Sequence, residues 1–102
     1  MVDKVVVKRL VLDVMKPHKP SLIQVGRELS ALPGIDGCNI TTIEIDKSVE
    51  NVKITIDGTD IDYDKMEAVL EENGSTVHSV DKISVGKKSK KLVEEAEYRP
   101  QR

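Results

Sequence analysis

Apolar residues recur along this chain with the period of a strand in some segments and the period of a helix in others. The order of these segments predicts six elements. Dense β-branched residues near the start indicate a long strand with apolar side chains on both faces. Three later segments alternate as strands do, and two segments between them have helical spacing. The predicted strands span residues 4–15, 38–46, 52–58 and 75–86, and the predicted helices span 21–32 and 63–73.

The order of these elements predicts an α+β fold of the ferredoxin-like type. In this βαββαβ sandwich, a four-stranded antiparallel sheet carries two helices on one face. Apolar density is greatest in 4–15 and 52–58, which places them at the centre and gives the strand order 4-1-3-2. Residues 47–51 are expected to form a hairpin loop. We expect residues 1–86 to form this single domain and 87–102 to form a charged C-terminal tail.

Several local signals mark where the elements end or bend. Pro17 is expected to interrupt the first strand, because proline cannot donate to a ladder. Ser21 followed by Gln24 predicts a capping box at the first helix. Gly26 within that helix indicates close packing against the sheet. A change of parity in the second strand predicts a β-bulge near Thr41-Thr42.

Composition and charge narrow the classes of function. Lys and Arg number 16 against 18 Asp and Glu, which argues against a nucleic-acid binder because such proteins carry a basic excess. Cys38 is the single cysteine, so an intrachain disulfide framework and a CxxC site are excluded. Charges recur every few residues in the N-terminal segment, which is therefore neither a signal peptide nor a membrane span. We expect a cytoplasmic protein without nucleic-acid or membrane partners.

Closely spaced aspartates before the second helix raise the question of a metal site. Asp60, Asp62, Asp64 and Glu71 match carboxylate positions of a calcium loop. Lys65, however, stands where such a loop needs glycine, which excludes an EF-hand. The favoured interpretation makes Asp62 the helix N-cap and places Asp64 in the first turn, where the helix dipole favours negative charge. The alternative is a weak divalent-cation site formed by Asp60, Asp62 and Asp64.

A basic turn precedes the first helix. Lys16, His18 and Lys19 lie just before Ser21, and helix N-termini attract anions through their free N–H groups and dipole. The favoured interpretation is a solvated basic turn. The alternative is a site at these four residues for a ligand that carries phosphate or carboxylate.

The chain offers few residues for catalysis. It has two histidines and one cysteine, and these assemble into no nucleophile–base pair, paired acid or ligand set. His78 is expected on the sheet surface, and Cys38 is expected to pack as a small apolar residue. We therefore expect a non-enzymatic protein without a cofactor.

Four stretches of the sequence together resemble a small archaeal family, domain of unknown function 211. They are Ala31–Gly37, Gly58–Asp64, Asn73–Asp81 and Val85–Lys87. The resemblance covers about residues 3–97, and His78-Ser79-x-Asp81 with its trailing glycine is its most specific part. It implies a ferredoxin-like fold and a homo-oligomeric, ring-like assembly. It implies no activity, because none is established for the family, and it transfers no functional residues.

Assembly also follows from the first strand. Alternation assigns Val5, Val7, Arg9, Val11, Asp13 and Met15 to one face and Val6, Lys8, Leu10, Leu12 and Val14 to the other. Neither face is polar enough to face water alone. We therefore predict a self-assembling homo-oligomer larger than a dimer, such as a ring, with room for a small ligand or ion between subunits. The alternative function is a regulatory or sensor domain for a small anionic molecule.

Overall fold

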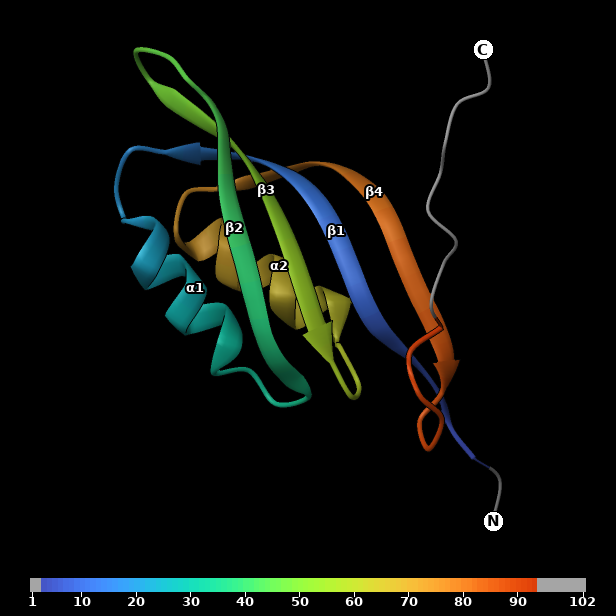
Figure 1. The fold of residues 1–102 in the computed structure, drawn as a ribbon. Coiled ribbons are helices and arrows are strands. Elements are labelled where there is room, and N and C mark those ends of the chain that lie inside the picture. The colour runs from blue at the N-terminus through green and yellow to red at the C-terminus, as the bar shows by residue number, and fades with distance from the viewer. Residues whose placement is uncertain (1–2, 94–102) are drawn as a thin grey trace, which may run out of the picture.

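Four strands and two helices make up residues 3–93, the part of the chain that the computed structural model describes. In order they are β1 (Val5–Pro17), α1 (Leu22–Ser30), β2 (Ile35–Ile45), β3 (Val49–Gly58), α2 (Tyr63–Glu72) and β4 (Thr76–Lys87). The strands form one antiparallel sheet in the order β2-β3-β1-β4, and both helices lie behind it (Figure 1). The predicted α+β ferredoxin-like fold and its strand order are confirmed.

The core lies between the sheet and the two helices and is aliphatic. Alternate residues of the two central strands and the inner stripe of each helix supply it, as the sequence pattern predicts. Its most deeply buried members are Leu12, Val14, Val25, Leu29, Val52, Ile54, Ile56, Met66 and Leu70. Burying a side chain of this size contributes about 1.5–3 kcal/mol, so this layer holds the helices on the sheet. No helix in residues 3–93 is long and apolar enough to cross a membrane.

One β-bulge changes which residues of β1 face the core. The register with β4 shifts between Val7 and Arg9, which leaves Lys8 as an extra residue. Val7 packs against the core cluster, whereas Val6 is buried outside it. Buried residues still alternate along the whole strand, but the predicted assignment of Val7 to the face opposite Leu10 was wrong. Apolar residues of both parities in this strand gave no signal of where the bulge falls.

The hairpin between β2 and β3 is tighter than predicted. The Asp46 carboxylate accepts the N–H groups of Ser48 and Val49, both at 3.0 Å, and closes a short loop where 47–51 was expected. β3 therefore begins at Val49, and its longer ladder extends β1 to Pro17. Only β3 flanks β1 at this point, because β4 begins opposite Met15. The proline thus ends the strand two residues later than expected.

Bulges also shape both edge strands. The register of β2 shifts between Thr42 and Glu44, which confirms the bulge predicted beside Thr41-Thr42. His78 and Asp81 have no cross-strand partner in β1, so each is an extra residue that interrupts the β4 ladder. The stretch that most specifically carries the family resemblance is therefore the stretch where β4 departs from a regular ladder.

The first helix begins and packs largely as predicted. The Ser21 hydroxyl accepts the N–H of Gln24 at 3.2 Å, which confirms it as the N-cap. The Gln24 side chain donates to Glu28 at 3.1 Å, and the reciprocal bond of a capping box does not form among the described residues. Gly26 faces β2, where the Cys38 thiol lies 3.7 Å from its carbonyl oxygen. The packing role predicted for Cys38 is confirmed. The close packing predicted at Gly26 is looser than expected, because a Cβ there would lie 3.6 Å from Ile40 Cδ1, an ordinary contact.

The segment after β4 folds back beside the start of β1. Lys88 N–H donates to the Lys4 carbonyl at 2.8 Å, and Ser89 N–H donates to the Asp3 carboxylate at 3.3 Å. Residues 88–93 are thus attached to the domain at the start of the predicted tail. Residues 94–102 of that tail lie outside the described part of the chain.

Candidate functional site

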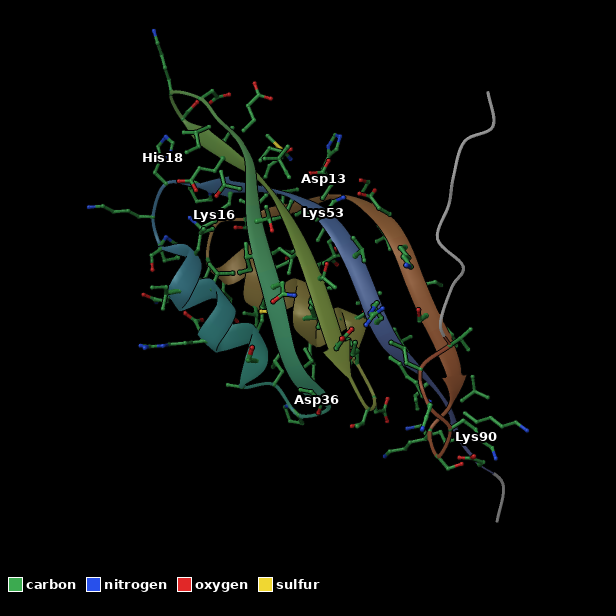
Figure 2. The ribbon with its side chains drawn as sticks, viewed as in Figure 1. Asp13, Lys16, His18, Asp36, Lys53 and Lys90 are labelled. Carbon is green, nitrogen blue, oxygen red and sulfur yellow. The ribbon has the colours of Figure 1, made fainter. Side chains whose placement is uncertain are left out.

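The four residues predicted to bind an anion lie where β1 leads into α1 (Figure 2). Lys16 and His18 meet at Glu50 on β3, with Lys16 Nζ 3.8 Å from Oε1 and His18 Nδ1 3.0 Å from Oε2. Lys19 is exposed, and the Ser21 hydroxyl is engaged as the cap of α1. The structure therefore brings together two of the four residues, around a carboxylate of the same chain.

His18 is held at both ring nitrogens. Its Nε2 lies 3.0 Å from the carbonyl oxygen of Lys47, and its Nδ1 faces Glu50. Both partners accept hydrogen bonds, so this geometry suits the doubly protonated imidazolium. The hydrogen bond to Glu50, followed by that to Lys47, raises the pKa of His18 above its ordinary value.

Lys16 is a deeply buried cation, with only 2 % of its surface exposed. Its ammonium donates to the carbonyls of Pro17 at 2.8 Å and His18 at 3.5 Å, and Glu50 compensates its charge. Sequence analysis missed Glu50, because the predicted loop 47–51 removed it from the sheet. Lys16 and Glu50 are direct cross-strand partners, so extending the ladder by two residues would have revealed the pair.

The three aspartates proposed as cation ligands have separate roles. The Asp62 carboxylate accepts the N–H of Lys65 at 3.2 Å, which confirms it as the N-cap of α2. Asp64 lies in the first turn, and Asp60 accepts from Lys4 Nζ at 3.0 Å. Within residues 3–93, no group of three or more His, Cys, Asp or Glu side chains could hold a metal ion. The geometry adds no support to the divalent-cation site, which stays a prediction.

The apolar core continues onto edge strand β4, where the helices of residues 3–93 leave three aliphatic side chains exposed. Val80, Ile83 and Val85, which we call the β4 strip, are 45 %, 57 % and 45 % exposed. Their cross-strand partners in β1 are Leu12, Leu10 and Val7. These partners belong to the core or pack against it, so the β4 strip lies on the helix side of the sheet. Figure 1 shows the helices behind the other strands, with β4 extending beyond them.

The opposite face of the sheet is more polar than β1 alone indicates. Arg9 donates to both carboxylate oxygens of Asp57, at 2.7 and 3.1 Å, and Asn51 donates to Asp13. Val11 on this face is half-buried. The exposed aliphatic residues instead lie mainly at the edges and on α1. Besides the β4 strip, they include Val5, Ile23, Ile43, Ile45 and Val93.

Comparison with known proteins places the chain among uncharacterised sequences. A family model, DUF211, described as uncharacterized ArCR, matches residues 8–102. The uncharacterized protein MJ0319 of Methanocaldococcus jannaschii is 46 % identical over 82 residues, which cover 80 % of this chain and 84 % of that relative. Neither description names an activity, a ligand or a partner.

Proposed function

Because the chain belongs to the DUF211 family, whose description names no activity, we propose a function from its surface: a non-enzymatic, self-assembling module. Its subunits join at the edges of the sheet into a homo-oligomer larger than a dimer. The observation that carries this proposal is the β4 strip, which exposes three aliphatic side chains directly beside the core.

A second copy of the chain is the partner that best fits the β4 strip. A sheet normally buries one face against another layer, and here the helix layer reaches Val77 of β4 but leaves the β4 strip exposed (Figure 1). Covering apolar surface contributes about 25 cal/mol for each Å² removed from water. A neighbouring subunit would supply the missing cover and extend the core across the interface.

Two different apolar surfaces favour an assembly larger than a dimer. The β4 strip lies at one edge of the sheet, and Ile43 and Ile45 lie on β2 at the opposite edge. A contact between two different surfaces can repeat from subunit to subunit and close into a ring. The bulges at His78 and Asp81 interrupt the β4 ladder, so this contact would rest on side-chain packing more than on added strand pairing.

The alternative of an anion sensor at Lys16, His18, Lys19 and Ser21 receives less support. Glu50 already faces the buried Lys16 and the exposed His18, which leaves Lys19 as the exposed cation of the four that Glu50 does not face. A small ligand or ion between subunits remains compatible with assembly and forms part of the proposal.

The proposal is tested by placing a charge in the β4 strip. Ile83→Asp should reduce the mass measured by light scattering during size exclusion, because a buried carboxylate opposes the contact. The matched control is Ile23→Asp, which makes the same change at an exposed position on α1 and should leave the mass unchanged. Circular dichroism would show that both variants fold. An unchanged mass for folded Ile83→Asp would contradict assembly through the β4 strip.

A further inference from the structure

β1 buries two lysine side chains, one near each end, and their surroundings differ. Lys16 is compensated by Glu50. Lys8 is 7 % exposed, and its ammonium donates to the carbonyl oxygen of Lys90. Among the ion pairs within residues 3–93, none includes Lys8. Buried charges in proteins are normally paired, because an unpaired buried charge costs free energy. A negatively charged partner would therefore stabilise this ammonium.

Lys8 lines a cavity at the end of the sheet where the segment after β4 folds back. The cavity has a volume of about 230 Å³. Its charged and hydroxyl-bearing lining residues are Lys8, Lys88, Lys90, Asp36, Asp57 and Thr59. Lys8 is the extra residue of the β1 bulge, and bulges commonly turn a side chain away from the regular alternation. The bulge thus accounts for a lysine in this position.

The balance of charge around the cavity is positive. Asp57 is bound at both carboxylate oxygens by Arg9, so its charge is compensated. Asp36 is exposed on β2 and lines the cavity, and Figure 2 shows it well apart from Lys90, which lies in the segment after β4. The three positive charges of Lys8, Lys88 and Lys90 therefore exceed the one uncompensated negative charge of Asp36. The excess positive charge lies on the side of the cavity toward β4.

We propose that this cavity binds a small anion, a phosphate or a carboxylate group, with the Lys8 ammonium as its central donor. An ammonium has three N–H donors, and one is used on the Lys90 carbonyl. Lys88 and Lys90 flank the bound group and add charge from the rim. The volume is below the range of about 300–1,000 Å³ for drug-sized ligands, so the site suits a small ion or one anionic group.

This site is separate from the predicted anion site at Lys16 and His18, which lies at the other end of β1. It is also independent of the proposed assembly, because its residues belong to one chain and exclude the β4 strip. Failure of either proposal therefore leaves the other standing.

Calorimetric titration with inorganic phosphate, and separately with succinate, tests the site at low ionic strength. We expect saturable binding of at least one of these anions, and the comparison shows whether phosphate or carboxylate is preferred. Lys8→Met should weaken the binding of the preferred anion by at least about tenfold, which is the effect of losing one charged hydrogen bond. Asp36→Asn should tighten binding, because it removes the opposing charge.

Lys53→Met is the matched control, since it removes the same charge from an exposed position away from the cavity (Figure 2). It should bind the anion as the unmodified chain does. If Lys8→Met does not fold, the double variant Lys88→Gln, Lys90→Gln on exposed side chains takes its place and should also weaken binding. Saturable binding of neither anion, or equal weakening by Lys53→Met and the cavity variant, would overturn the proposal.

Discussion

The Nδ1 atom of His18 lies 3.0 Å from Oε2 of Glu50, and this contact ties the turn before α1 to the β2–β3 hairpin. The same carboxylate lies 3.8 Å from the ammonium of Lys16. One acidic side chain therefore faces two cations, and both cations belong to the segment that sequence analysis had interpreted as a basic turn.

The first prediction concerns pH. The pKa of His18 is raised above 6.5, first by its hydrogen bond to Glu50, so the folded chain holds this proton more tightly than the unfolded chain. Its contribution to stability is fully present below about pH 6.5 and is lost as the pH rises through the raised value. The urea midpoint should therefore fall over this window. His18→Gln should lack that fall while it keeps Lys16 and Glu50, and identical pH profiles for both proteins would contradict the role of His18.

The second prediction concerns Glu50. Glu50→Gln leaves the buried Lys16 ammonium without its counter-charge, and breaking a buried pair destabilises strongly. We expect the free energy of unfolding to fall by about 3 kcal/mol. Glu44→Gln removes the same charge from an exposed position on β2 and should change stability by less than about 0.5 kcal/mol. Equal effects of the two substitutions in urea unfolding would show that Glu50 does not compensate Lys16.

The third prediction contrasts two glycines. A Cβ at Gly26 would lie 3.6 Å from Ile40 Cδ1, an ordinary contact, so Gly26→Ala should stabilise α1 by about 1 kcal/mol. Gly34 has a φ of 84°, and a Cβ there would collide with the carbonyl oxygen of Asp60. Gly34→Ala should therefore destabilise the fold by more than about 2 kcal/mol. Thermal unfolding of both variants measures the contrast, and changes of the same sign would contradict it.

The fourth prediction separates a helix cap from a metal site. Asp62→Ala removes the N-cap of α2 and should lower stability by about 1 kcal/mol without any added metal. Asp60→Ala removes an exposed pair with Lys4 and should cost less than about 1 kcal/mol. A large rise in melting temperature with calcium or magnesium, lost in Asp60→Ala, would instead support a cation site.

Much of the fold was readable in the sequence. The alternation of Val52, Ile54 and Ile56 identified a central strand, and all three are buried. Ser21 and Asp62 identified both helix starts, because a cap depends on residues only a few positions apart. Such local signals can be read from the sequence without knowledge of the tertiary structure.

Features that depend on register were harder to predict. Lys8 became the extra residue of a bulge in a strand whose two faces are both rich in apolar residues, so no break in pattern marked it. Glu50 meets His18 only because the hairpin ladder extends β1 to Pro17. The exposure of Ile83 depends on how much of β4 the helix layer covers, which alternation within a strand does not encode.

Self-assembly is the central claim, and the mass of the unmodified chain in solution tests it most directly. Light scattering during size exclusion, repeated across micromolar concentrations, should give one mass that is a whole multiple of 11.3 kDa and larger than two subunits. A mass of 11.3 kDa at every concentration would contradict the account.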